Sequence, residues 1–534
     1  MPSITVMHTG KQILCQKGES LMDALLDAGV FLEHACNGAG VCGKCKVKTY
    51  RGDFSRMTTT EREMLSREEI EKGIRLACMT KVEGDGEIDV LQKERPYRIL
   101  TKEYVPPFQR DAVSEGWGIA ADIGTTTVAA ALTDLQTGEV LETASMVNGQ
   151  RRYGLDVLTR ITYENEQGQQ GISQLQQAAV RTLSQLTEEM CSRRNIPLSA
   201  LREIVVAANC TMTHMLLGVD ARPIGKAPYR PAFLEGRTCP TGEVGLPGSE
   251  KTTLYCLPQV SGYVGGDIVA GAYVCGLHKA SGNVLFIDIG TNGELVLSAQ
   301  GRLLCCSCAA GPALEGMNIT SGMAAAEGAV EEVSITENGI SLKVIGEQAP
   351  VGLCGSGILS AVKEMLRTGM LRKNGAFSKE NGQEAFWKDM LQTNGGKKAL
   401  LLSQDPQILV TQKDVRQVQL AKGAIRSGMD ALLAKAQLTV EDLDQVMIAG
   451  QFGQYLPEES LLGVGVLPQE VRGRLTYVGN SSKTGAYMAL LSQKARAEME
   501  ELALRMEYME LAESENYERL FARSTIFPEN RSVK

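Results

Sequence analysis

Residues 122–127 read DIGTTT, and residues 288–293 read DIGTNG. Each hexapeptide ends an apolar, strand-like run and precedes two more such runs, within GWGIAADIGTTTVAAALTDLQTGEVLETAS (116–145) and NVLFIDIGTNGELVLSAQGRLLCCSC (283–308). Mixed helical and strand-like sequence follows each copy. A repeat of this kind predicts a duplicated α/β domain with a cleft between its two halves.

The repeated element has the composition of a phosphate clamp. An aspartate at the end of a strand, followed by a glycine turn, leaves hydroxyl and backbone N–H groups free to surround phosphate oxygens. The carboxylate can hold hydrated Mg²⁺, which prefers one or two carboxylates and several waters. One D-x-G-T sequence would be weak evidence, because tight Asp- and Gly-containing turns are common in hairpins. Two copies in matched contexts favour a nucleotide site, and the lack of a G-x-x-x-x-G-K-[ST] sequence argues against a P-loop.

A cysteine motif lies near the N-terminus. Cys36, Cys42 and Cys45 follow the pattern C-x5-C-x2-C, and Cys78 lies further along the chain. Three close ligands and one distant ligand suit a [2Fe-2S] cluster. The glycines of the loop CNGAGVCGKC allow tight turns that direct N–H groups toward the sulfurs. A structural zinc site and reduced core cysteines are the alternatives. Zinc ligands, however, usually form two close pairs, and buried cysteines rarely lie in Gly-rich loops.

A second group of cysteines, Cys305, Cys306 and Cys308, lies in the third strand-like run of the second repeat. Strand alternation puts Cys306 and Cys308 on one face and Cys305 on the other. Small apolar residues are expected there, so we predict core packing rather than a metal site for these three.

The patterns divide the 534-residue chain into five parts. Residues 1–94 predict a small α+β domain that opens with two strands and then a helix, for which Ser20 and Asp23 form a capping-box pattern. Residues 95–116 are charged and proline-containing and predict a linker. The two halves of the duplicated domain are 117–282 and 283–490. Residues 491–534 predict a packing helix with a polar tail.

Composition limits the classes of partner. A formal charge of −8 and a pI near 5.4 give no basic stripe, so nucleic acid is not expected as a partner. The longest apolar runs are too short to span a membrane, and the N-terminal residues lack the pattern of a signal peptide. We therefore expect no membrane association and a cytoplasmic location.

Parts of the sequence resemble two known families. Residues up to about 95 resemble the β-grasp ferredoxins, with a cysteine spacing closest to the adrenodoxin-like branch. The two D-I-G-T loops resemble the phosphate motifs of the superfamily of acetate and sugar kinases, the heat-shock chaperone ATPase and actin. In that superfamily a later glycine-rich turn holds the adenosine, and VMIAGQFGQYL (446–456) resembles it. GLCGSGILS (352–360) could offer a helix N-terminus to a phosphate, although a purely structural helix start explains it nearly as well.

Taken together, the parts resemble the reductive activators of corrinoid proteins. The segments YGLDVLTRI (153–161), SGYVGGDIVAG (261–271) and GPALEGMNITSGM (311–323) also resemble theirs. The resemblance implies a β-grasp ferredoxin domain followed by a duplicated, actin-like (ribonuclease H-like) ATPase domain. It implies ATP-dependent, one-electron reduction of Co(II) to Co(I) in a corrinoid protein of a methyltransferase system. It further implies a low-potential electron donor, such as ferredoxin or flavodoxin, and leaves a homodimer open.

The predicted site residues follow from the motifs and this resemblance. Asp122 and Asp288 would position Mg²⁺, and Asp267, in the GGD segment, would orient the attacking water. The predicted ATP contacts are Gly124, Thr125, Thr126, Thr127, Gly290, Thr291, Asn292, Gly293, Gly355, Ser356, Gly450 and Gly453. Two other functions remain open: a small-metabolite kinase with a regulatory cluster, and a simple electron carrier or redox sensor.

Overall fold

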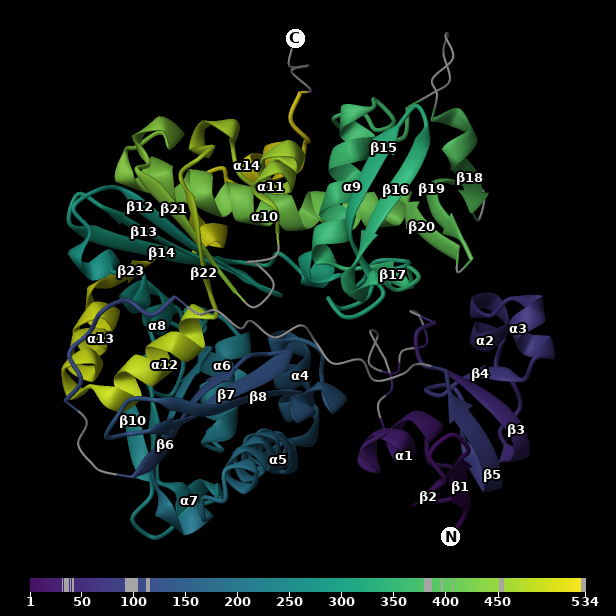
Figure 1. Ribbon diagram of the computed structural model, residues 1–534, viewed down its shortest axis with the longest axis horizontal. Coiled ribbons are helices and arrows are strands. Elements are labelled where there is room, and N and C mark those ends of the chain that lie inside the picture. The colour runs from purple at the N-terminus through teal and green to yellow at the C-terminus, as the bar shows by residue number, and fades with distance from the viewer. Residues whose placement is uncertain are drawn as a thin grey trace. The chain divides into compact units, whose positions relative to one another are not determined.

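The computed structural model describes residues 1–30, 32, 38, 40, 43–91, 104–111, 116–378, 387–394, 397–405, 407–450 and 456–529. The chain divides into two compact units. One consists of Met1–Pro96 with Gln150–Leu155, and the other of Tyr97–Gly149 with Asp156–Lys534 (Figure 1). The second unit therefore begins within the predicted linker, 95–116.

The first unit is built on a five-stranded sheet in the order β2-β1-β5-β3-β4. β1 is parallel to β5, and the other neighbours are antiparallel, which is the β-grasp arrangement. Ile4, Leu21, Val47 and Ile88 are among the fully buried residues that join the sheet to α1. The elements are β1 (Ser3–Val6), β2 (Lys11–Leu14), α1 (Leu21–Asp27), β3 (Lys46–Phe54), α2 (Thr59–Met64), α3 (Arg67–Glu71), β4 (Ile74–Leu76) and β5 (Val82–Val90).

The capping box predicted at the start of α1 does not form. Ser20 occupies the N-cap position, but its side chain makes no capping hydrogen bond and its buried hydroxyl has no partner. Complete capping boxes instead start α2, from Thr58 and Glu61, and α3, from Ser66 and Glu69. In both, Glu stands at the third helical position and its carboxylate accepts from the N-cap N–H. Asp can fill the same position, as Asp414 does at the start of α10 (Gln412–Ala436), so residue type alone does not explain why the Ser20 box fails to form.

The second unit contains two six-stranded sheets with matching topology. Their orders are β10-β11-β9-β6-β7-β8 and β22-β21-β12-β13-β14-β23. In each, the strand that carries the D-I-G-T aspartate is antiparallel to the next strand and parallel to a later one, β6 to β9 and β12 to β21. The predicted duplication and fold class are confirmed.

The first sheet and its helices comprise β6 (Trp117–Ile123), β7 (Thr127–Asp134), β8 (Val140–Val147), α4 (Val157–Gln167), α5 (Gln169–Arg193), β9 (Leu201–Ala208), α6 (Cys210–Leu216), β10 (Arg237–Pro240), α7 (Thr241–Val244), β11 (Thr253–Cys256) and α8 (Gly266–Val274). The second comprises β12 (Val284–Ile289), β13 (Gly293–Ala299), β14 (Arg302–Cys308), α9 (Gly355–Arg367), α10 (Gln412–Ala436), β21 (Gln445–Ala449), α11 (Glu458–Val464), β22 (Leu475–Gly479), α12 (Ser481–Leu491), α13 (Gln493–Arg505) and β23 (Met506–Tyr508).

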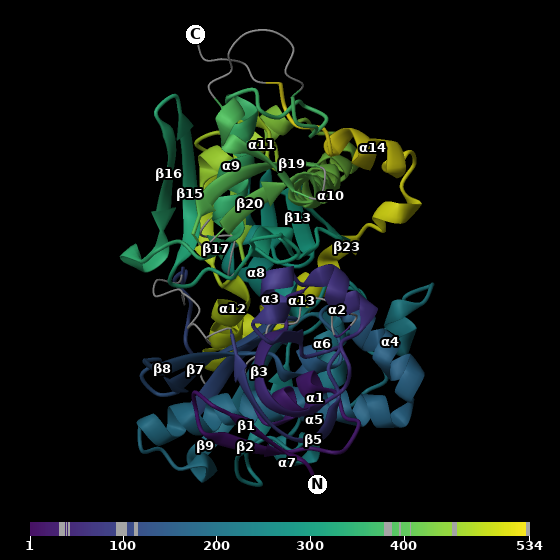
Figure 2. The same ribbon diagram turned by 90° about the vertical axis from the view of Figure 1, so that its right-hand side faces the viewer.

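Two smaller sheets extend the second half. They consist of β15 (Ala329–Thr336), β16 (Gly339–Val344) and β17 (Gly352–Leu353), and of β18 (Leu391–Asn394), β19 (Lys397–Gln404) and β20 (Gln407–Thr411). Figure 2 shows the β15–β16 hairpin beside α9, at one edge of this half.

Both faces of the second large sheet are covered, which explains the nearly continuous apolar run of β12. Leu285 and Ile287 face a core with α9 and α10, whereas Phe286 faces a core with α8, α12 and α13. Those last three helices lie between the two large sheets (Figure 1). Cys306 and Cys308 belong to the first core and Cys305 to the second, so their predicted core packing is confirmed.

The C-terminal segment differs from the prediction of one packing helix with a polar tail. After α13, β23 pairs in parallel with β14 and extends the second sheet. α14 (Tyr517–Ser524) follows, and Phe527 is buried in the core. The segment therefore completes the fold of the second half.

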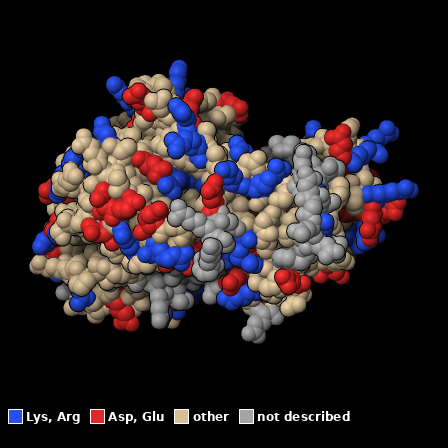
Figure 3. Space-filling view, turned by 90° about the horizontal axis from the view of Figure 1, so that it is seen from above, with Lys and Arg blue, Asp and Glu red and all other residues tan. Residues whose placement is uncertain are grey.

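In the parts of the chain that the structure describes, no helix combines the length and apolar character needed to cross a bilayer. On the face drawn in Figure 3, Lys and Arg side chains are interspersed with Asp and Glu.

Candidate functional site

Hydrogen-bond donors from Asn148 and Arg160 bind the carbonyl groups of the first D-I-G-T loop. The carbonyl of Gly124 accepts from the Asn148 side chain at 2.9 Å, and that of Thr126 accepts from the Asn148 backbone at 2.9 Å. The carbonyl of Thr125 accepts from the fully buried guanidinium of Arg160. Because the N–H and C=O of one peptide group point in opposite directions, the N–H groups of Thr125, Thr126 and Thr127 are turned away from these donors, as an anion site requires. The Gly124 N–H, in contrast, donates to the Thr127 carbonyl at 3.0 Å.

Hydroxyl groups add to this loop. The Thr125 hydroxyl accepts from the Asn209 amide at 3.2 Å, and Asn209 also caps α6. The Thr127 hydroxyl is buried, with only 6% of the residue exposed, and has no hydrogen-bond partner. A buried hydroxyl without a partner is costly, so this one is suited to a polar ligand.

The second loop has its own supports. The Gly290 N–H donates to the Asn292 carbonyl at 3.0 Å, and the Thr291 hydroxyl donates to Glu315 at 2.7 Å. Gly450 follows β21 with φ of +102°, and a Cβ atom there would lie 2.4 Å from the Ile289 carbonyl and 2.9 Å from a carboxylate oxygen of Asp288. Only glycine permits the chain to pass so close to Asp288.

Asp122 is held by the start of α12. Its carboxylate accepts from the Asn480 side chain at 2.8 Å and from the Ser482 hydroxyl at 2.9 Å. Asn480 is also the N-cap of α12, so Asp122 lies at the positive end of this helix, where a negative charge is stabilised.

Three further acidic side chains gather near Asp122, all half-buried. Burial, and then the charges of Asp288 and Asp122, raise the pKa of Asp267 to about 8. Burial and Asp122 raise the pKa of Asp288 to about 7. Glu294 pairs directly across the strands with Asp288, and burial, Asp267 and Asp288 raise its pKa well above the ordinary value. The structure thus brings together Asp122, Asp267 and Asp288, which lie in three distant parts of the sequence.

Mutual repulsion among buried carboxylates is relieved by a cation, so the acidic group fits Mg²⁺. In the described part of the chain, no three His, Cys, Asp or Glu side chains converge closely enough to hold a metal directly. Mg²⁺ usually retains water and takes phosphate oxygens, so the residues fit an ion that arrives with a nucleotide.

The other predicted nucleotide residues are less clearly placed. Cβ atoms at Gly355 and Gly357 would lie 1.8 Å and 2.0 Å from the carbonyls of Leu314 and Val330. Close packing at the start of α9 therefore explains these glycines without a ligand, and the phosphate contact of Gly355 and Ser356 stays a prediction. Gly453 lies outside the described residues.

Two of the predicted cluster ligands are described, and they lie together. Cys45 precedes β3, and Cys78 follows β4, the antiparallel neighbour of β3. Their sulfur atoms are 3.3 Å apart, and neither cysteine is in a disulfide. The hydrogen bond between the two thiols, together with backbone donors, lowers the pKa of Cys45 to about 7, as suits a thiolate ligand. Cys36 and Cys42 lie outside the described residues.

The glycines of the cysteine loop have the conformations that the motif predicts. Gly38, Gly40 and Gly43 have φ of +84°, +75° and +64°. Cβ atoms at these positions would lie 3.0–3.2 Å from Met22, Met79 and Met64, respectively. Tight turns packed under apolar side chains, together with two adjacent cysteine sulfurs, fit an iron–sulfur cluster.

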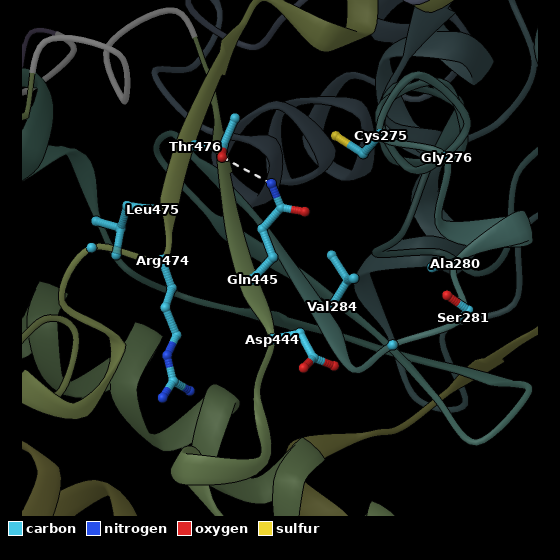
Figure 4. Close-up of a pocket in the computed structure, with 12 residues that line it drawn as sticks. Cys275, Gly276, Ala280, Ser281, Val284, Asp444, Gln445, Arg474, Leu475 and Thr476 are labelled. Atoms are coloured by element: carbon cyan, nitrogen blue, oxygen red, sulfur yellow. Dashed lines mark hydrogen bonds between the residues drawn. The ribbon is translucent and has the colours of Figure 1, made fainter.

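A hollow of about 730 Å³ lies at the other end of the strands of the second sheet, away from Asp288 (Figure 4). Val284, Gln445 and Leu475 line it and are the first residues of β12, β21 and β22. Its charged groups already bind the backbone: Asp444 accepts from the Asn283 N–H, and Arg474 donates to the Leu443 carbonyl. We therefore assign the chemistry to the aspartate end of β12 and not to this hollow.

Comparison with known proteins agrees with this geometry. Residues 4–83 match the 2Fe-2S iron-sulfur cluster binding domain, 117–280 the RACo middle region, and 282–533 the C-terminal domain of RACo, the ASKHA domain. Corrinoid activation enzyme RamQ of Eubacterium limosum is 33% identical over 422 residues, which cover 78% of this chain and 71% of RamQ. This chain belongs to the reductive activators of corrinoid proteins.

Two further relatives support this family membership. A solved reductive activator for corrinoid, iron–sulfur protein matches 99% of both chains at 31% identity, with a TM-score of 0.70. The [Co(II) methylated amine-specific corrinoid protein] reductase of Methanosarcina barkeri is 24% identical over 439 residues, which cover 76% of each chain.

Sequence reasoning missed several residues of this activator's site. They are Asn148, Arg160, Asn209, Asn480, Ser482 and Glu294. Arg160 lies in a segment that already resembles the family, YGLDVLTRI, and an arginine on an otherwise half-apolar helix was the available signal. Glu294 directly follows the second motif, but only the strand register sets it across from Asp288.

Proposed function

We propose that this protein uses ATP hydrolysis to drive one-electron reduction of a corrinoid protein from Co(II) to Co(I). The observation that carries the proposal is the meeting of Asp122, Asp267 and Asp288 from both halves of the duplicated domain, in a chain of the corrinoid-activator family. One electron passes from a donor to cobalt, while ATP and water become ADP, phosphate and a proton.

The electron route rests on the cysteine motif. When bound, a [2Fe-2S] cluster supplies a one-electron site of low potential, about −400 mV in plant-type ferredoxins. Cys36, Cys42, Cys45 and Cys78 would hold it, and the Met22, Met64 and Met79 side chains would keep water from the loop. The electron donor is a low-potential carrier such as ferredoxin or flavodoxin, and a cytoplasmic location belongs to the same proposal.

Both D-I-G-T loops contribute groups to the proposed nucleotide site. The Gly124 and Gly290 N–H groups already donate to carbonyls within their own loops, so the remaining loop groups would bind phosphate oxygens. The Arg160 charge lies beneath the first loop. Asp122 and Asp288 would hold hydrated Mg²⁺. The backbone at Gly450 passes beside Asp288, where the turn predicted to hold adenosine begins.

The attacking water needs an acceptor. Asp267 and Glu294 are the two acidic side chains of the group that are not assigned to Mg²⁺. Glu294 accepts a hydrogen bond from Ser307 at 3.2 Å, which fixes one of its oxygens and leaves the other for a ligand. We assign the orientation of water to Glu294, with Asp267 as the alternative predicted from sequence.

ATP is needed because the electron transfer is unfavourable alone. An uphill one-electron transfer loses a factor of about ten in product for every ~59 mV. A nucleotide shifts such an equilibrium only if it binds one conformation more tightly than another. A site assembled from both halves has this property, because closing the halves completes it.

The test uses the Co(II) form of a corrinoid protein, a low-potential reductant and the holo activator. Conversion to Co(I), followed by absorbance, should require both Mg-ATP and the activator. Cys45→Ser should retain ATP hydrolysis and lose cobalt reduction, whereas Asp288→Asn should keep the cluster spectrum and lose hydrolysis by about 100-fold or more. Cys239→Ser, a change at a half-buried free cysteine of the other unit, is the matched control.

The outcomes separate the alternatives. Cobalt reduction at equal rate without ATP would contradict the coupling and indicate a simple electron carrier. ATP turnover that depends on a small hydroxylic compound would indicate a kinase. Stoichiometric zinc in place of iron would contradict the cluster assignment.

A further inference from the structure

The segment before the duplicated domain is partly anchored to it. Within the predicted linker, Phe108 packs edge-on against Tyr487, with ring centroids 6.0 Å apart. The Asp111 N–H donates to the Leu491 carbonyl at 3.1 Å, and its carboxylate accepts from the Gln493 N–H at 2.8 Å. We call these five residues the linker dock. Residues 104–111 are therefore held by the C-terminal end of α12 and the start of α13.

The same helix holds the nucleotide site at its other end. Asn480 and Ser482, in the first turn of α12, donate to the two carboxylate oxygens of Asp122. α12 runs from Ser481 to Leu491, a length of about 16 Å. One short helix thus connects the first-half aspartate to the linker dock.

α12 packs as a rigid element against α8. It crosses α8 so closely that a Cβ atom at Gly485 would lie 2.5 Å from the Ala270 Cβ. α8 carries Asp267, so the two helices that pack together both begin at the acidic group. A displacement of the first turn of α12 is therefore passed to its last turn and not absorbed by a loose contact.

We propose that α12 couples nucleotide binding at Asp122 to release of the linker dock, with Asn480 and Ser482 as positioning residues. This inference rests on the proposed function. Both oxygens of Asp122 already accept from α12, so a nucleotide-borne cation near Asp122 draws on the same carboxylate charge and weakens those two hydrogen bonds. The competition gives the nucleotide a different affinity for the docked and released states, which is the condition for coupling.

Release changes the reach of the cluster-bearing unit. With the dock closed, residues 92–103 are the connection, and twelve residues span at most about 40 Å. Release adds the residues up to Gly116 and roughly doubles that limit. The concentration of the cluster unit near any tethered target depends on this length.

Limited proteolysis of the holo full-length protein tests the coupling. Trypsin cleavage after Arg110 requires the dock to open, because the next residue, Asp111, is bonded to Leu491 and Gln493. Cleavage after Lys102, outside the dock, is the internal control. Mg²⁺ with a non-hydrolysable ATP analogue should raise cleavage after Arg110 by about fivefold relative to Lys102.

Thermodynamic linkage requires that opening the linker dock also strengthen nucleotide binding. Phe108→Ala, which weakens the dock, should lower the Kd for the analogue by the same factor. Val105→Ala, at an exposed residue of the same segment, should leave the Kd unchanged. In Ser482→Ala the effect of the analogue on Arg110 cleavage should shrink, because one of the two bonds between α12 and Asp122 is gone.

The outcomes are distinct. Protein that binds the analogue but is cut after Arg110 at an unchanged relative rate overturns this inference alone. A full-sized effect in Ser482→Ala also overturns it, since α12 would then not be the link. Protein that does not bind the analogue contradicts the proposed function, and this inference with it.

Discussion

The two D-I-G-T hairpins have the same strand order but place different residues beside the aspartate. In the first, Ala129 pairs with Asp122; in the second, Glu294 pairs with Asp288. The third strand contributes serine in both, Ser145 and Ser307. The two halves therefore share the strand pairing but differ in the residue opposite the aspartate, which is a carboxylate only in the second half.

The aspartates themselves also differ. Asp122 receives hydrogen bonds from Asn480 and Ser482, whereas among the described residues none donates to the Asp288 carboxylate. The first loop is also one residue longer: it joins the paired residues Ile123 and Val128, whereas the second loop joins Ile289 and Gly293. The extra residue is Thr127. The first half is thus organised to bind a ligand, and the second half concentrates negative charge that a bound cation would neutralise.

The largest expected effect tests the added carboxylate. Glu294→Gln should lower ATP hydrolysis by about 100-fold, because the amide cannot take a proton from the attacking water. The Kd for Mg-ATP should stay within about twofold, since the phosphate contacts are unchanged. Single-turnover hydrolysis and equilibrium binding separate the two effects.

The matched control is Ser307→Ala, which removes the hydrogen bond to Glu294 but keeps its charge. We expect a loss of only a few-fold in hydrolysis. An equal loss in both variants, or a weakened Kd in Glu294→Gln, would mean that Glu294 acts in folding or binding.

A smaller effect is expected from the extra residue of the first loop. Thr127→Val keeps the shape of the side chain but removes a buried hydroxyl that has no partner among the described residues. Nucleotide affinity should fall by about tenfold, while stability without nucleotide should not decrease. Thr133→Val is the control, because its hydroxyl is equally buried and unpartnered but lies at the far end of β7. Calorimetric titration with Mg-ATP measures both; similar affinities in the two variants would remove Thr127 from the site.

The smallest effect concerns the stability of the nucleotide-free protein, and the two aspartates should give opposite signs. Asp122→Asn loses charge-assisted hydrogen bonds and should destabilise by about 1–2 kcal/mol. Asp288→Asn removes a repelled charge and should stabilise the protein at neutral pH. Both tryptophans, Trp117 and Trp387, lie in this unit, so their fluorescence follows its denaturation.

The pH dependence of the unfolding free energy tests whether charge repulsion at Asp288 causes this difference. The folded protein protonates Asp288 with a pKa of about 7, raised by burial and by Asp122, whereas an unfolded aspartate has a pKa of about 3.9. The folded state therefore binds the extra proton between these values, and its stability falls as pH rises through that window. The advantage of Asp288→Asn should grow from pH 5 to pH 8. An advantage independent of pH would show that repulsion is not its source.

The sequence alone determined the elements that depend on local pattern. The repeated D-I-G-T loops predicted the duplicated domain, because a strand, a glycine turn and a second strand leave a periodicity that can be read along the chain. The C-x5-C-x2-C loop predicted its positive-φ glycines, and alternation placed Cys306 and Cys308 on the face opposite Cys305. Local capping was less predictable, as Ser20 shows, because the spacing of residue types does not determine how a side chain is oriented.

Only the tertiary structure decided which residues surround the aspartates. When the two motifs are aligned by sequence, Glu294 corresponds to Val128. In the structure the second loop is one residue shorter, so the strand pairing places Glu294 at the position of Ala129. Glu294 therefore faces the same side of the sheet as Asp288. Asn480 and Ser482 lie more than 350 positions after Asp122, yet they bind it because α12, which follows β22 of the other sheet, packs against β6. Contacts across such separations arise from strand order and helix packing, and no pattern within a short window encodes them.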